Sequence, residues 1–284
     1  MQVIKTIREA RETAHAARRA GKVVGLVPTM GALHEGHGQL IERARSESGL
    51  LVVSVFVNPL QFGPGEDYTR YPRTLGADLD FCETRAVDVV FTPEPSELYP
   101  DVQKTFVEVE EIPSELCGRF RPGHFRGVAT VVLKLFNIVL PDRAYFGEKD
   151  AQQLRVIEQM VSDLNLTVEI VSVPTAREPD GLAISSRNRY LTRDQRRSAP
   201  ILYEALNAAY QALCSGERDA AKILAASDAV LARDSAVRKE YLEVVEARLM
   251  TPVTTVEGPV RIAGAVWIEK TRLIDNLYWK DLSY

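Results

Sequence analysis

Two of the histidines stand three residues apart in the segment His34-Glu35-Gly36-His37, a spacing that could serve phosphate chemistry. Gly31 and Gly36 have no Cβ, so a ligand can approach the main chain closely at these positions. Two neighbouring imidazoles can donate hydrogen bonds or positive charge to a phosphate group. An isolated pair of this kind is also compatible with a zinc pair or with two ordinary surface histidines. The secondary structure predicted on either side of the pair distinguishes between these hypotheses.

The histidine segment stands between a predicted strand and a predicted helix. The apolar run from Lys22 to Val27 indicates a buried strand, which Pro28 should end because proline has no main-chain N–H. Residues 39–48 have the apolar spacing of a helix. A helix that begins after a strand directs unpaired N–H groups and its positive dipole end at an anion. This context favours a nucleotide-phosphate site over a zinc pair.

The chain alternates predicted strands and helices as far as about residue 175. Further strands are expected at 50–57, 87–91, 105–109, 142–146 and 166–173, and helices at 2–20, 73–86, 126–139 and 151–164. Such alternation predicts an α/β fold with a Rossmann-like, doubly wound parallel sheet.

The pattern changes after Pro174. Helices are expected at 194–214 and 218–233, and strands at 241–246, 260–268 and 271–277. This arrangement predicts a smaller C-terminal α+β domain. We place the two domains at 1–175 and 176–284.

Composition narrows the class of protein. The net charge of −4 is spread over interspersed charges, so we expect neither a nucleic-acid nor a membrane partner. The three cysteines, Cys82, Cys117 and Cys214, are far apart and form no Cys-x-x-Cys pair, which indicates a reducing compartment and no dedicated metal site. No apolar run approaches the ~18 to 20 residues of a membrane span, and no signal core precedes the first helix. We therefore expect a cytoplasmic protein. P-loop and dinucleotide fingerprints are absent from the sequence.

Polar residues that follow other predicted strands are candidates for the same site. Asn58 and Gln61 follow the strand at 50–57, and Lys149 follows the strand at 142–146, where α/β sheets bind ligands. Gln153 lies on the next helix. The loop at 184–187 contains two serines and ends in an arginine, a combination that could close over a triphosphate. Taken singly, each of these residues could also be a solvated surface residue.

Five segments together resemble the pantothenate synthetase (pantoate–β-alanine ligase) family, which belongs to a wider His-x-Gly-His nucleotidyl-transferase superfamily. In the order of the family they are residues 28–37, 56–63, 121–128, 145–150 and 184–188. The resemblance covers essentially the whole chain. It implies ATP-dependent condensation of pantoate with β-alanine to pantothenate, through a pantoyl adenylate and with release of pyrophosphate and AMP. It also implies a homodimer and a C-terminal lid over a nucleotide- and pantoate-binding domain. The chemistry of ATP in turn indicates Mg²⁺ bound through ATP, since the sequence has no dedicated metal site.

The resemblance implies roles for the residues that match. His34, His37 and Lys149 should be catalytic at the ATP phosphates, with His37 as proton donor. Gln61 and Gln153 should bind pantoate, and Asn58 is a further candidate for pantoate or β-alanine, with Arg121 and His124 as weaker ones. The ATP-binding residues should be Met30, Gly31, Ala32, Leu33, His34, Glu35, Gly36, His37, Gly147, Glu148, Lys149, Asp150, Ala176, Ile184, Ser185, Ser186 and Arg187.

Gly38 departs from the pattern of the family, which usually has an apolar residue, commonly leucine, after the second histidine. Glycine lowers the stability of a helix by roughly 1 kcal/mol relative to alanine, so we expect a looser first helical turn at this position. No matched catalytic residue is lost.

Two other functions have to be weighed against the ligase. A nucleotidyl transferase of the same superfamily would transfer the nucleotide to a phosphorylated small molecule, but Gln61, Gln153 and the segment 121–128 favour the ligase. A non-catalytic nucleotide sensor on the same fold would not need the two histidines, Lys149 and the loop at 184–187 together.

Overall fold

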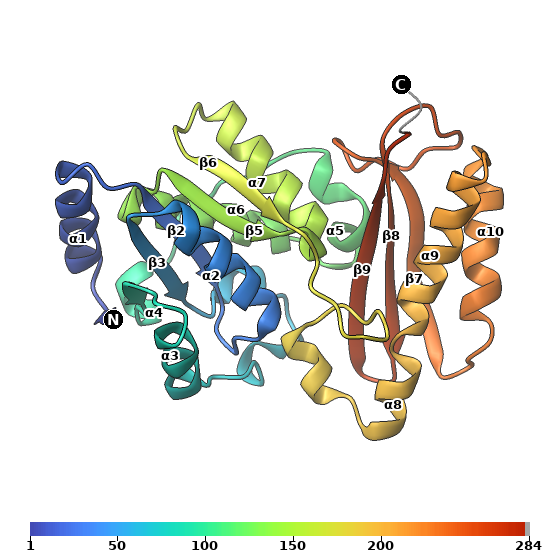
Figure 1. The fold of residues 1–284 in the computed structure, drawn as a ribbon, viewed down its shortest axis with the longest axis horizontal. Helices are drawn as coiled ribbons and strands as arrows, with labels where there is room; N and C mark the ends of the chain where they lie inside the picture. Colours follow the sequence, from blue (N-terminus) through green and yellow to red (C-terminus); the bar gives the residue numbers. More distant parts are fainter. Residues whose placement is uncertain (282–284) are drawn as a thin grey trace. The chain divides into compact units, whose positions relative to one another are not determined.

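The computed structural model describes residues 1–281, which form two compact units (Figure 1). The first unit consists of Met1–Val109, Arg121–Glu148 and Val156–Pro174. The second unit consists of Glu110–Phe120, Lys149–Arg155 and the described part of Thr175–Tyr284. The chain therefore enters the second unit twice before it stays there from Thr175 onward.

A six-stranded parallel sheet is the centre of the first unit. Its strands, in spatial order, are β1 (Gln2–Ile4), β4 (Val89–Phe91), β3 (Leu50–Val55), β2 (Val24–Thr29), β5 (Arg143–Gly147) and β6 (Glu169–Val173). Every neighbouring pair is parallel. Because β3 lies on one side of β2 and β5 on the other, the order of strands reverses between β2 and β5. The predicted α/β, doubly wound parallel sheet is thus confirmed.

Helices connect these strands. They are α1 (Ile7–Arg19), α2 (Glu35–Glu47), α3 (Leu75–Glu83), α4 (Pro95–Leu98), α6 (His124–Val139) and α7 (Ala151–Asp163), with 3-10 turns η1 (Pro59–Gln61) and η2 (Asp67–Thr69). Leu40 and Ile41 of α2 pack with Val27 of β2 and Val53 of β3 in one apolar cluster. The apolar runs of the sequence are continuous because such central strands are covered on both faces.

Two local predictions in the N-terminal part are wrong. Residues 2–20 are not one helix, because Gln2–Ile4 form β1 and pair with β4 before α1 begins. Strand β2 does not end at Pro28 but continues to Thr29. The carbonyl of Thr29 accepts from Phe56 on the β3 side, so the nitrogen of Pro28 faces the β5 side. Pairing with β5 ends at Leu26, and the missing N–H therefore breaks no ladder bond.

The strand predicted at 105–109 does not form either. Its main chain is bound by helix α6 instead, since the N–H of Val107 donates to Oγ1 of Thr130 at 3.0 Å. The guanidinium of Arg126 lies 3.9 Å from the ring centre of Phe106. The alternating pattern of this segment thus reflects contacts with a helix and not with a sheet.

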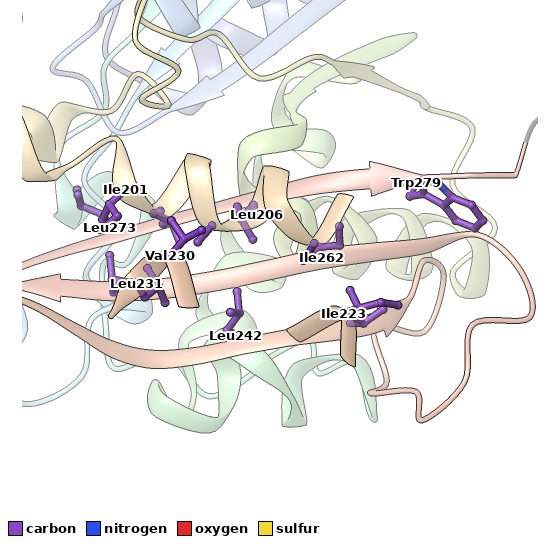
Figure 2. Close-up of a cluster of buried hydrophobic side chains, with 14 of the residues drawn as sticks. Ile201, Leu206, Ile223, Val230, Leu231, Leu242, Ile262, Leu273 and Trp279 are labelled. Carbon is purple, nitrogen blue, oxygen red and sulfur yellow. The ribbon is translucent and has the colours of Figure 1, made fainter. Parts of the chain in front are cut away.

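An antiparallel sheet of three strands organises the second unit. The strands β7 (Val237–Glu246), β8 (Val260–Ile268) and β9 (Thr271–Trp279) lie in that order, and α9 (Ile201–Cys214) and α10 (Ala220–Leu231) share its apolar core. Figure 2 shows Leu206 of α9 and Leu231 of α10 beside Leu242 and Ile262 of the sheet. The predicted helix at 194–214 is divided at Pro200 into α8 (Arg193–Ser198) and α9. The remaining short elements are η3 (Ile112–Ser114), α5 (Leu116–Phe120), η4 (Glu148–Asp150) and η5 (Ser186–Tyr190).

None of the helices within residues 1–281 is both long enough and apolar enough to cross a membrane.

Candidate active site

The turn between β2 and α2 carries the histidine pair, and a buried carboxylate shapes it. Gly31 and Ala32 both have positive φ angles, 80° and 51°. Asp78 of α3, only 2% exposed, accepts hydrogen bonds from the N–H groups of Ala32 at 3.1 Å and Leu33 at 2.8 Å. These charge-assisted bonds stabilise a main-chain conformation that alanine rarely adopts. Asp78 could not be predicted from the sequence, because no local pattern marks an aspartate that bonds to main chain 45 residues away.

The two imidazoles lie against one another at the start of α2. His34 is the residue that precedes the helix, His37 lies in the first turn, and their ring centres are 4.1 Å apart. The N–H of His34 donates to Nδ1 of His37 at 3.3 Å. Since Nδ1 accepts, a neutral His37 carries its proton on Nε2. His37 is thereby prepared to act as a hydrogen-bond donor where the N-terminus of the helix attracts anions.

The topology of the sheet places this turn at the reversal between β2 and β5. In open α/β sheets, ligands bind outside the carboxyl ends of strands at such a reversal. Residues 30–37 follow the carboxyl end of β2, and Gly147 is the last residue of β5. A Cβ on Gly147 would meet no atom within 4 Å, so the main chain is accessible there. The ends of these two neighbouring strands therefore offer open main chain beside the N-terminus of α2, a combination that suits a phosphate.

Gln61 and Asn58 lie close to the same edge, in the segment after β3. Gln61 is 7% exposed, and its amide nitrogen lies 3.1 Å from the sulfur of Met30 in the histidine turn. Its amide oxygen accepts from Nδ2 of Asn58 at 3.1 Å. The hydroxyl of Tyr99 donates to Oδ1 of Asn58 at 2.9 Å. Three of the predicted site residues, Met30, Asn58 and Gln61, are thus brought together.

Arg121 and His124 bind the main chain of Gln61. One guanidinium nitrogen of Arg121 lies 3.1 Å from Nε2 of His124, and Nδ1 of His124 lies 2.8 Å from the carbonyl oxygen of Gln61. A guanidinium can only donate, so Nε2 accepts, and the proton of a neutral His124 sits on Nδ1 and is donated to Gln61. Burial alone would raise the pKa of Glu66, but its hydrogen bonds and ion pair with Arg121 at 2.5 Å hold that pKa below its ordinary value. Arg121 and His124, the weaker candidates for the substrate pocket, therefore hold the main chain of Gln61 in place.

Gly127 of α6 allows the Gln61 segment to approach the helix closely. A Cβ at this position would lie 2.2 Å from the carbonyl oxygen of Leu60 and 2.7 Å from Cα of Gln61. We expect Gly127→Ala to lower the free energy of unfolding by about 1–3 kcal/mol, because main chain must move. The same shift should raise the KM for a ligand bound by Gln61.

Thermal unfolding would measure the first effect, and initial rates at increasing concentrations of the substrate that Gln61 is predicted to bind would measure the KM. Gly76→Ala is the matched control, since a Cβ on Gly76 of α3 would meet nothing within 4 Å. Wild-type stability and KM in Gly127→Ala would contradict the assignment.

Lys149 and the loop at 184–187 belong to the second unit. The side chain of Lys149 is 18% exposed, and its Nζ lies 3.7 Å from a carboxylate oxygen of Asp150. The N–H of Ile184 donates to the carbonyl of Ala176 at 2.9 Å, which brings these two predicted residues together. The hydroxyl of Ser185 accepts from the N–H of Arg187 at 3.3 Å. Two candidate phosphate-binding segments are therefore ordered within this unit.

The two neighbouring glutamines of α7 differ in role. Gln152 is 6% exposed and accepts from the N–H of Cys117 at 3.0 Å. Its amide nitrogen donates to the carbonyl oxygens of Ile112 at 2.8 Å and Glu115 at 2.7 Å. Gln152 therefore binds the segment 110–120 to the start of α7, whereas the half-buried Gln153 stays the predicted substrate ligand of the two.

No group of three or more His, Cys, Asp or Glu side chains within residues 1–281 is arranged to hold a metal ion.

The doubly wound sheet and the histidine turn at its strand reversal define an α/β enzyme that binds a nucleotide. The sequence model described as pantoate-beta-alanine ligase matches residues 2–278. A pantothenate synthetase of Caldicellulosiruptor saccharolyticus is 52% identical over 98% of this chain and 99% of its own length. The chain therefore belongs to the pantoate–β-alanine ligase family, and the prediction of an ATP-dependent ligase for pantoate and β-alanine is confirmed.

Solved structures agree with this assignment. The crystal structure of a pantothenate synthetase from Thermus thermophilus matches with a TM-score of 0.92 at 47% identity, over 98% of this chain and 99% of that one. A pantoate-beta-alanine ligase from Francisella tularensis, described as complexed with beta-gamma ATP and beta-alanine, matches with a TM-score of 0.77 at 35% identity, over 98% and 97%.

Proposed function

We propose that this chain joins pantoate to β-alanine through a pantoyl adenylate. A carboxylate oxygen of pantoate attacks the α-phosphorus of ATP, and pyrophosphate leaves. The amine of β-alanine then attacks the acyl carbon, forms the amide and releases AMP. The observation that carries the proposal is the histidine turn at the β2–β5 reversal of a chain that matches this ligase family over residues 2–278.

The residues at this turn suit the first step. Negative charge grows on the leaving pyrophosphate, and hydrogen-bond donors that are already in place stabilise it. We assign this role to His34 and His37, with the Nε2 proton of His37 as the donor that its Nδ1 bond to His34 sets up. Residues 30–36 would bind the nucleotide through their main chain, and Gly147 and Glu148 would do so from the end of β5.

Residues of the second unit complete the proposed set. Lys149 would place a positive charge at the phosphates, and Asp150 would bind the nucleotide. The remaining proposed ATP ligands are Ala176, Ile184, Ser185, Ser186 and Arg187. We further propose that 176–284 acts as a lid on the nucleotide- and pantoate-binding part, 1–175. This division is supported by the course of the chain, which stays in the second unit from Thr175 onward.

Pantoate should be bound by amide side chains. Gln61 and Gln153 can each donate to a carboxylate and accept from a hydroxyl, which suits a hydroxy acid. Asn58 orients Gln61 by donating to its amide oxygen. Among the three, Asn58 is the most buried at 1% exposure, which supports a role in orientation more than in direct binding.

We propose that Mg²⁺ enters with ATP and is held by phosphate oxygens, which are the hard ligands it prefers. A homodimer and a cytoplasmic location are further proposals, and they derive from the resemblance to the family.

The overall reaction can be tested with purified protein, Mg²⁺, ATP and pantoate, with and without β-alanine. Without β-alanine, we expect about one pyrophosphate to be released per enzyme molecule. Once β-alanine is added, we expect sustained formation of AMP and pantothenate. ADP in place of AMP, or a product that does not depend on β-alanine, would contradict the proposal. A nucleotidyl transferase would retain the nucleotide in its product, and a sensor would form none.

A further inference from the structure

We propose that Asp275 and Asn276 of β9 are positioning residues for adenylate formation. They hold two segments to which the proposed function assigns ATP phosphates, the turn at Lys149 and the loop that ends in Ser185–Arg187. The inference rests on that proposed function. It concerns residues that would act by positioning these segments, and it lies wholly within the second unit.

Asn276 binds the main chain of Lys149. The residue is 6% exposed, and its Nδ2 donates to the carbonyl oxygen of Lys149 at 3.0 Å. Its Oδ1 accepts from the guanidinium of Arg261 of β8 at 2.7 Å. Because a guanidinium only donates, the amide oxygen must face Arg261 and the amide nitrogen must face Lys149. The orientation of the amide is thus determined at both ends.

Asp275 binds the loop through Arg177. Its two carboxylate oxygens, in a side chain 3% exposed, lie 2.6 and 3.0 Å from the guanidinium nitrogens of Arg177. Arg177 also donates to the carbonyl of Gly181 at 3.0 Å and forms a β-bridge with Ala183. A bidentate pair of this kind restricts direction as well as distance. The Arg177–Asp275 pair therefore constrains both sides of the loop, at Arg177 and at 181–183, immediately before Ser185.

The two residues reach these segments from opposite faces of one strand. Asp275 is paired with Gly264 of β8, and a Cβ on Gly264 would point at Leu202 and Leu206 of α9. Successive side chains of a strand alternate between faces, so Asn276 points away from α9. One strand thereby determines where both segments lie. Burial raises the pKa of Asp275, and the nearby charges of Arg177 and Lys149 oppose that rise, which agrees with a short distance between Lys149 and this strand.

This arrangement predicts an effect on only one of the two chemical steps. The triphosphate is a reactant in adenylate formation but is absent when β-alanine attacks the adenylate. A shift of a binding group by about 1 Å can slow a reaction about 10²-fold. Loss of the bond between Asn276 and Lys149 should therefore slow the first step and leave the second step almost unchanged.

The test uses the full chain with Asn276→Asp, which keeps the oxygen that faces Arg261 but has no donor for the Lys149 carbonyl. Pyrophosphate release from ATP and pantoate in a single turnover should fall about 10- to 100-fold. Conversion of supplied pantoyl adenylate by β-alanine should stay within about twofold of the wild type, because that step does not involve the triphosphate. Asn276→Ala, which adds no charge, should show the same division between the steps.

Asn137→Asp is the matched control, since Asn137 of α6 is exposed and also donates its amide to a main-chain carbonyl, that of Leu133. It should leave both steps unchanged. An equal fall of both steps in the Asn276 variants would show a general structural role and overturn the inference, and so would wild-type rates in both steps. Lys149→Ala separates the two proposals. If it slows adenylate formation while Asn276→Asp does not, only the inference fails, and if Lys149→Ala has no effect, the proposed role of Lys149 itself fails.

Discussion

His37→Ala should lower the rate of adenylate formation by about 10²–10³, the usual cost of removing one donor from a developing negative charge. The proton of His37 is expected on Nε2, because Nδ1 accepts the N–H of His34. In the proposed function pyrophosphate departs beside this donor, and alanine removes it. Single-turnover release of pyrophosphate from ATP and pantoate measures the effect without the second step.

The control for this variant is His15→Ala, which removes an exposed imidazole from α1. It should retain the wild-type rate. Thermal unfolding of both variants shows whether α2, which begins at Glu35, remains folded when His37 is replaced. A wild-type rate of adenylate formation in a folded His37→Ala protein would remove His37 from the mechanism.

Lys149→Ala should cause a loss of similar size, about 10²–10³ in the same step, because it removes the fixed positive charge that we propose for the phosphates. Lys149→Arg should recover only part of the wild-type rate of adenylate formation, since a guanidinium is planar and spreads its charge, whereas an ammonium is a compact charge. The attack of β-alanine on supplied pantoyl adenylate should change little. Lys222→Ala, which removes a lysine from α10 whose side chain is 70% exposed, is the control in the same unit. Equal losses in both steps would contradict the assignment of Lys149 to the phosphates.

Gly38 illustrates how a departure from the family pattern can be explained only in three dimensions. The guanidinium of Arg85 lies 3.7 Å from the ring centre of Phe81 and pairs with Glu35 at 2.8 Å. A Cβ on Gly38 would lie 3.0 Å from Nε of Arg85. Glycine thus leaves room for an arginine that covers this side of α2, and the helix passes through Gly38 without interruption. The lower stability of its first turn stays a prediction.

Much of the first sheet could be predicted because its signals are local. The run 50–57 is apolar almost throughout, and a strand buried on both faces requires this. Strand β1 has no comparable signal, since its three residues are stabilised by pairing with β4, far along the chain. The effect of Pro28 on its strand cannot be predicted from the sequence for a related reason, because the cost of a missing N–H depends on which neighbouring strand the nitrogen faces.

The candidate site likewise combines features that local sequence signals predict with features that depend on contacts between distant residues. The fold class and the family could be predicted from the chain alone, because residue types and their spacing specify which elements form and which hydrogen bonds and charges are available. The reacting groups named from the same residues stay predictions. What holds these groups in place is visible only in the folded protein. Asp78 on the histidine turn, Gln152 on the segment 110–120 and Asn276 on Lys149 bind main-chain atoms that are distant in sequence. A main-chain N–H or carbonyl is the same group in every residue, so no sequence pattern reveals which side chain will bind it.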